Sequence, residues 1–181
     1  MIQILVPTSF SLRGPDIPNA YFPAPHQNVR LEAEFSISGV DIQGVGITAR
    51  GDASNHYLFR TFPDRVTIFK RVAGKPYLLA EKMMTTIPTE GVAECKLGLD
   101  IYNDTIRGYY NGNFTIEVKD PDFIQGATVG VDIWSTGAVA EGTIQAWETS
   151  GGGFWTKRWG TIALVTGMVG VLGLVFLGKR K

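Results

Sequence analysis

The segment VRLEAEFSI, residues 29–37, decides the fold because apolar and polar side chains alternate along it. Apolar residues occupy the odd-numbered positions, and polar residues such as Arg30 and Glu32 lie between them. A β-strand places successive side chains on opposite faces, so this pattern is typical of a strand with one buried face. The segment is therefore predicted to be a half-buried strand.

Short strand-like runs continue on the C-terminal side of this segment. They cover residues 42–50, 56–62, 65–71, 76–82, 92–100, 105–110, 113–119, 127–134 and 141–147. Turn-forming pairs separate them, and Asn111-Gly112 suits a tight hairpin because both residues tolerate positive φ. No helical period occurs before residue 155. The pattern predicts an all-β fold, an antiparallel β-sandwich or barrel, over residues 29–149.

Residues 1–28 differ from this pattern because they contain five of the nine prolines. Proline lacks the N–H that a sheet ladder needs, so this segment is predicted to be an extended arm with little regular structure. Ile2, Ile4 and Val6 alternate in sequence and could add one edge strand.

Two stretches resemble the concanavalin A-like, laminin G-like superfamily. They are HYLFRTFPDRVTIFKRVAGKPYLLAE (56–81) and CKLGLDIYNDTIRGYYNGNFTIEVKDPDFIQGATVGVDIWSTGAVAEGTIQAW (95–147). The positions that carry the second resemblance are Ile106, Tyr109, Asn111, Gly112, Asp120, Phe123, Gly126, Val129 and Gly130. The resemblance covers roughly residues 29–147 and implies a jelly-roll sandwich of two curved antiparallel sheets. It implies binding of glycans or proteins but no particular ligand.

The segment WGTIALVTGMVGVLGLVFLG, residues 159–178, contains no charged side chain. Roughly 20 helical residues at about 1.5 Å each span the ~30 Å hydrocarbon core of a bilayer. We therefore expect a C-terminal transmembrane helix, preceded by a Gly-rich joint at 150–158 and followed by a basic tail at 179–181. The residues expected to anchor it at the two interfaces are Trp155, Lys157, Arg158, Trp159, Lys179, Arg180 and Lys181.

This apolar segment also carries a stripe of small residues at helical spacing. Its members are Ala163, Thr166, Gly167, Gly170 and Gly173. Small side chains let helices approach closely in lipid, which favours contact with another membrane protein subunit. The alternative is that these glycines simply face lipid.

The charges are unevenly distributed along the chain. Lys157 and the residues after it include five of the 17 Lys and Arg but none of the 17 Asp and Glu, which leaves the preceding part with a formal charge of −5. Nucleic-acid binding is not expected, because it requires a basic face. The N-terminus lacks a basic n-region, so a single-pass membrane protein with a cytoplasmic head is favoured; the basic C-terminal tail favours the alternative, a periplasmic or extracellular head.

Aromatic residues in the strands are the candidates for a ligand platform. Tyr109, Tyr110 and Trp134 could stack on a sugar ring, with Asn111 and Asp132 as hydrogen-bonding partners. The alternative is that these rings pack in the core or cover a sheet face.

Residues for catalysis or metal binding are sparse. Glu32 and Glu34 share a strand face, but the sequence contains no carboxylate motif of the kind that a retaining glycanase uses. We therefore expect that the protein is not an enzyme and that it binds no cofactor. Asp120 and Asp122 could bind calcium, although turn capping explains both equally well. Cys95, the only cysteine, is expected to be an inert core residue.

These features favour a non-catalytic, membrane-anchored structural or interaction subunit. Its sandwich and its helix would dock onto a larger membrane protein assembly, such as an energy-transducing complex or a virion. The alternative is a membrane-tethered, lectin-like module that binds carbohydrate. A sugar-active enzyme with an unrecognised site is a third hypothesis.

Overall fold

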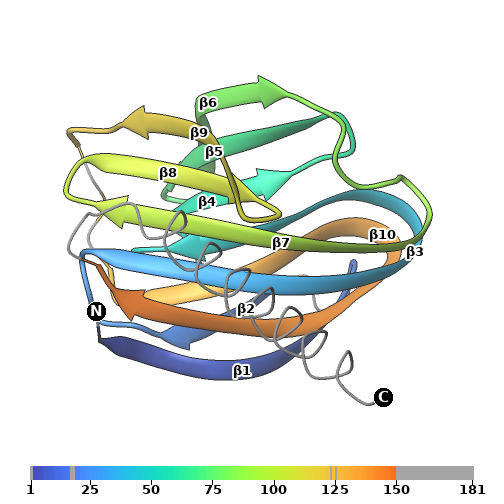
Figure 1. The fold of residues 1–181 in the computed structure, drawn as a ribbon, viewed down its shortest axis with the longest axis horizontal. Helices are drawn as coiled ribbons and strands as arrows, with labels where there is room; N and C mark the ends of the chain where they lie inside the picture. Colours follow the sequence, from blue (N-terminus) through green and yellow to red (C-terminus); the bar gives the residue numbers. More distant parts are fainter. Residues whose placement is uncertain (1, 17–18, 123, 125, 150–181) are drawn as a thin grey trace, which may run out of the picture. The chain divides into compact units, whose positions relative to one another are not determined.

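The computed structural model describes residues 2–16, 19–122, 124 and 126–149, all of which belong to one compact unit. The described part of the chain consists of ten antiparallel β-strands (Figure 1). They are β1 (Gln3–Arg13), β2 (Asn19–Pro23), β3 (Val29–Ala49), β4 (His56–Thr61), β5 (Arg65–Val72), β6 (Lys75–Met83), β7 (Gly91–Tyr102), β8 (Thr105–Tyr110), β9 (Asn113–Lys119) and β10 (Thr128–Glu148).

Two long strands, β3 and β10, pair with each other along nearly their whole length of 21 residues each. The first half of β3 also pairs with β7, and the second half pairs with β4. Both strands therefore run through two half-sheets. The first half-sheet has the order β1-β10-β3-β7-β8-β9, and the second has the order β2-β10-β3-β4-β5-β6.

The change of direction between the half-sheets occurs where the backbone leaves the regular strand conformation. On β3, Gly39 has φ +133° and Asp41 has φ +53°. On β10, the register with β3 shifts between Trp134 and Ser135. Such bulges bend a strand and increase its twist, which lets one strand serve both layers of a sandwich.

The core consists of the apolar side chains that the two half-sheets direct toward each other. In the second half-sheet Val131, Ile47, Phe59 and Ile68 are cross-strand neighbours, and all four are fully buried. The first half-sheet contributes the odd-numbered residues of the segment 29–37, as the alternation predicts. The prediction of an all-β antiparallel sandwich is confirmed.

The N-terminal segment is more regular than the sequence indicates. Strands β1 and β2 pair with the two halves of β10 and so form the edge of each half-sheet. The prolines do not prevent this pairing because of where they fall. Pro7 lies at a register irregularity of β1, and Pro23 is the last residue of β2. Leu12 of β1 is fully buried, which ties this segment to the core.

The buried face of β3, to which Ile47 belongs, gives a test of this architecture. Replacing Ile47 with alanine is expected to lower the free energy of unfolding by about 2–5 kcal/mol, because it removes fully buried methyl groups and leaves a cavity. Val92→Ala is the matched control, since Val92 is 74% exposed, and it is expected to change stability by less than about 0.5 kcal/mol. Urea unfolding of both variants measures the difference, and equal effects would contradict the core described here.

Candidate ligand-binding site

The outer face of the second half-sheet carries a row of functional side chains. Val45, Ile47 and Ala49 of β3 are fully buried, so Gly46 between them faces outward. Gly46 pairs with Arg60 on β4 and with Asp132 on β10. Because cross-strand partners share a face, Arg60 and Asp132 approach each other across a position that has no side chain.

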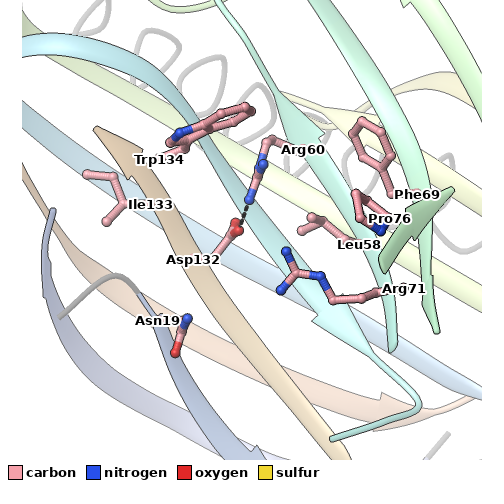
Figure 2. Close-up of a pocket in the computed structure, with 9 residues that line it drawn as sticks. All are labelled: Asn19, Leu58, Arg60, Phe69, Arg71, Pro76, Asp132, Ile133 and Trp134. Atoms are coloured by element: carbon pink, nitrogen blue, oxygen red, sulfur yellow. Dashed lines mark hydrogen bonds and ion pairs between the residues drawn. The ribbon is translucent and has the colours of Figure 1, made fainter. Parts of the chain in front are cut away.

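A pocket of about 400 Å³ lies on this face. Its lining residues come from five of the six strands of the half-sheet and are Asn19, Leu58, Arg60, Phe69, Arg71, Pro76, Asp132, Ile133 and Trp134 (Figure 2). Volumes of this order are typical of sites for small ligands. The pocket combines apolar side chains with three charged ones.

Arg60 and Asp132 form an ion pair at the centre of this pocket. Each side chain is only 13% exposed, so solvent screens the pair weakly. Gly46 is what makes room for it. A Cβ at position 46 would collide with the Asp132 carboxylate and would lie 2.7 Å from Cδ1 of Leu58. The glycine therefore lets the carboxylate lie close to the sheet, within reach of Arg60.

Trp134 provides a half-exposed aromatic surface beside the ion pair. The Arg60 guanidinium carbon lies 5.1 Å from the Trp134 ring centroid, within the range of a cation–π contact. The edge of Phe62 packs against the same indole with ring centroids 5.9 Å apart. The indole is nevertheless 50% exposed, so much of its surface remains available to a ligand.

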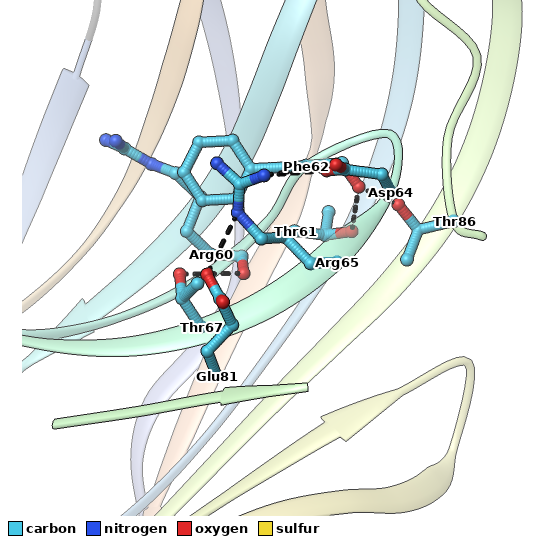
Figure 3. Close-up of polar contacts among 8 residues, drawn as sticks. All are labelled: Arg60, Thr61, Phe62, Asp64, Arg65, Thr67, Glu81 and Thr86. Atoms are coloured by element: carbon cyan, nitrogen blue, oxygen red, sulfur yellow. Dashed lines mark hydrogen bonds and ion pairs between the residues drawn. The ribbon is translucent and has the colours of Figure 1, made fainter. Parts of the chain in front are cut away.

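Further contacts support this arrangement from the neighbouring strand. The Arg65 guanidinium lies 4.6 Å from the Phe62 ring centroid and forms ion pairs with Asp64 and Glu81 (Figure 3). The Thr86 hydroxyl donates a hydrogen bond to the Phe62 carbonyl. Because Phe62 is held on several sides, it supports the Trp134 ring in one orientation.

His56 and Tyr21 lie on the same outer face. His56 Nδ1 is 2.8 Å from the carbonyl oxygen of Asp52, and its ring centroid is 6.2 Å from that of Tyr21. Burial lowers the pKa of His56; the hydrogen bond to Asp52 opposes this change and the positive charge of Arg71 adds to it. Burial also raises the pKa of Tyr21. Both side chains are therefore neutral near pH 7.

The residues that the sequence predicts to form one ligand platform lie in different parts of the structure. Trp134 and Asp132 lie in the pocket on β10, whereas Tyr109 and Tyr110 lie on β8 in the other half-sheet. Tyr109 is only 4% exposed, and Tyr110 packs against the core. The Asn111 side chain accepts a hydrogen bond of 2.8 Å from the backbone N–H of Lys96, which ties the turn between β8 and β9 to β7.

Sequence reasoning missed the basic side chains of the pocket. Arg60 and Arg71 lie in segments that the sequence predicts to be strands. The sequence does not reveal, however, that the sheet register brings these strands close to Asp132. One signal was present in HYLFR, residues 56–60, where alternation places His56, Leu58 and Arg60 on one face. The glycines at 44 and 46 of β3 were a second signal, because they open the face in front of that strand.

The two acidic residues considered for calcium have different surroundings. Asp120 accepts a hydrogen bond of 2.7 Å from the Tyr57 hydroxyl and lies 2.8 Å from Lys70 Nζ, so a lysine ammonium occupies the position of a cation. Asp122 is exposed, and its backbone N–H donates to Asp120. Among the described residues, no group of three or more His, Cys, Asp or Glu could hold a metal ion.

The remaining sequence predictions concern Cys95 and the C-terminal segment 150–181. Cys95 is buried, and burial raises the pKa of its thiol to about 12, as expected of an inert core residue. The joint, the apolar run, its small-residue stripe and the interfacial anchors lie within 150–181, outside the described residues. Within the part of the chain that the structure describes, no helix is long and apolar enough to cross a membrane.

Comparison with known proteins identifies similar folds. The carbohydrate-binding module CBM66 from Bacillus subtilis aligns with a TM-score of 0.62 at 20% identity, over 78% of this chain and 91% of that chain. A tetrameric galectin from the ball sponge Cinachyrella sp. aligns with a TM-score of 0.56 at 15% identity, over 72% and 99%. The galectin LEC-6 of Caenorhabditis elegans gives a TM-score of 0.52 at 14% identity, over 77% and 95%.

No family model matches the chain, and no curated protein matches its sequence. At the identities given above, the similarity to solved structures establishes the fold alone. The fold is a jelly-roll β-sandwich, as the sequence resemblance implied.

The surroundings of Asp120 predict a specific pH dependence of stability. Burial alone would raise the pKa of Asp120, but hydrogen bonds from Lys70 and Tyr57 lower it below the ordinary value. Its stabilising contribution is therefore complete at neutral pH and is lost as the pH falls below about 4. Asp120→Asn is expected to lower the free energy of unfolding at pH 7 by about 1–3 kcal/mol, and to lower it less at acidic pH.

Urea unfolding at neutral pH and near pH 3 measures this difference. Asp122→Asn is the matched control, because it makes the same change two residues away on an exposed side chain. If Asp120→Asn and Asp122→Asn had the same effect at neutral pH, the role given to the Lys70 and Tyr57 contacts would be wrong.

Proposed function

We propose that the β-sandwich is a carbohydrate-binding module. Its ligand would bind on the outer face of the second half-sheet, in the pocket between Arg60, Asp132 and Trp134. The observation that carries this proposal is the half-exposed Trp134 ring, which Arg60 and Phe62 hold at the edge of the pocket.

The chemistry of this face suits a sugar. A sugar ring has an apolar C–H face, which can stack on an exposed indole, and hydroxyl groups, which need polar partners at fixed positions. Trp134 supplies the apolar surface. Asp132 and Arg60 supply an acceptor and donors whose positions are fixed by their own ion pair. Such a prearranged site loses little side-chain entropy when it binds a ligand.

The fold is consistent with this function. The similar structures described above are named as a carbohydrate-binding module and as galectins. They support the lectin-like alternative of the sequence analysis better than a purely structural role. Docking onto a larger membrane assembly stays a prediction, because residues 159–178, for which the sequence predicts a transmembrane helix, lie outside the described residues.

We also propose that the module is not an enzyme. Glu32 and Glu34 share a face of β3, but Lys96 Nζ lies 3.1 Å from a carboxylate oxygen of each. Glu32 is in addition 3.6 Å from Nε of Arg30. Both carboxylates are therefore engaged by cations of the protein itself, and they do not form an open pair that could flank a scissile glycosidic bond.

The apolar run at 159–178 supports a further part of the proposal, namely that the module is tethered to a membrane. A tether would hold many copies on one surface. Weak single-site sugar binding would then be strengthened by multivalency.

Truncation of Trp134 tests the proposed function. The full-length chain in mild detergent would be applied to an array of neutral and acidic oligosaccharides, and the best ligand would be titrated by calorimetry. Trp134→Ala is expected to weaken binding by about thirtyfold, because a few aromatic side chains in contact with the ligand commonly supply most of the binding energy.

Phe114→Ala is the control for this experiment. Phe114 is a comparably exposed aromatic residue, 58% exposed, but it lies on β9 of the other half-sheet beside Tyr109. This variant is expected to bind as the unaltered chain does. The proposal would be refuted if no glycan bound, or if Trp134→Ala bound as tightly as the unaltered chain.

A further inference from the structure

Arg71 is a second basic residue of the pocket, and it has a different environment from Arg60. It lies on β5, where it pairs with His56 of β4 and with Pro76 of β6. Its guanidinium points across the pocket toward the β10 side (Figure 2). Among the described residues, the Arg71 guanidinium has no hydrogen-bond or ion-pair partner.

The charges that line the pocket do not balance. Arg60 and Arg71 are the two cations, and Asp132 is the single anion. Asp132 already pairs with Arg60 through Oδ2, so the residues that line the pocket keep one excess positive charge. This excess positive charge occurs in a part of the chain with a formal charge of −5, so it does not follow from composition.

The neighbouring groups do not supply the missing anion. His56 and Tyr21 are neutral near pH 7. The Asp52 carboxylate accepts hydrogen bonds from the N–H groups of Ser54 and Asn55, at 2.7 and 2.8 Å, and so caps its own turn. The described residues on the strands packed around Arg71 therefore offer no further carboxylate to pair with its guanidinium.

We propose that the preferred ligand is an acidic glycan whose anionic group pairs with Arg71 while the sugar ring contacts Trp134. This inference rests on the carbohydrate-binding function proposed above and names the class of sugar. A guanidinium presents parallel N–H donors that match the two oxygens of a carboxylate, and also those of a sulfate. Arg71 thus acts as the specificity-determining residue, and Trp134 serves acidic and neutral sugars alike.

The test uses pairs of related glycans, each with one acidic and one neutral member. One pair is an oligogalacturonate and its methyl-esterified form, and a second pair is a sialylated oligosaccharide and its desialylated form. A sulfated oligosaccharide and its unsulfated counterpart form a third pair, so the three arms distinguish the sources of the anion. The unaltered full-length chain is expected to bind the acidic member of at least one pair about tenfold more tightly, or about 1.4 kcal/mol.

Arg71→Gln is expected to reduce that preference to about one, because it removes the charge while keeping polar donors. The matched control is Arg13→Gln, which makes the same charge change at the exposed end of β1 in the other half-sheet. This variant is expected to keep the preference. Trp134→Ala is expected to weaken both members of a pair by the same factor.

The outcomes separate this inference from the proposed function. If the unaltered chain binds the acidic and neutral members equally, the inference is wrong, although binding that depends on Trp134 would still stand. If Arg71→Gln keeps the full preference, the assignment to Arg71 is wrong. If no member of any pair binds, both the inference and the proposed function fail.

Discussion

The antiparallel pairing of β3 with β10 is the constraint on which the rest of the structure depends. These two strands are the only ones in the described part of the chain that belong to both half-sheets, and every other strand is added to one side of this pair. Their bend at Gly39 and Asp41 turns a single ladder into two facing layers. The same pairing fixes the register that places Asp132 beside Gly46, so the architecture of the core and the geometry of the pocket have one origin.

The pocket forms because glycines and large side chains lie next to each other on the outer face of the second half-sheet. Gly46 on β3 and Gly130 on β10 have no side chain on this face, whereas residues around them, such as Arg60 on β4 and Trp134 on β10, carry large ones. A Cβ at Gly130 would lie 2.7 Å from the Thr48 hydroxyl, so the glycine is needed there for packing as well as for space. The result is a depression whose walls carry Arg60 and Trp134, both held in place by contacts that exist without a ligand.

Much of this fold follows from the local pattern, and most of the site does not. Alternation correctly predicts the strand at 29–37, and Asn111-Gly112 predicts the hairpin at which both residues have positive φ. The continuity of β3 through Gly39 was missed, because glycines within a strand read as an interruption. The pairing of Arg60 with Asp132 joins residues 72 positions apart, and a register of that kind is set by the whole ladder. Tyr109 was misplaced for the same reason, since one strand's pattern does not reveal which half-sheet the strand joins.

The position of β10 has a consequence for how the protein is made. It is the second strand from one edge in both half-sheets, and it is also the last of the described strands to leave the ribosome. Until it is released, β1 and β2 have no partner, and β3 presents one open edge along its entire length. Unpaired edges of this kind are aggregation-prone, and ladders between distant segments form slowly. Biogenesis of this protein therefore includes an interval in which a nearly complete but open sheet must be kept from self-association.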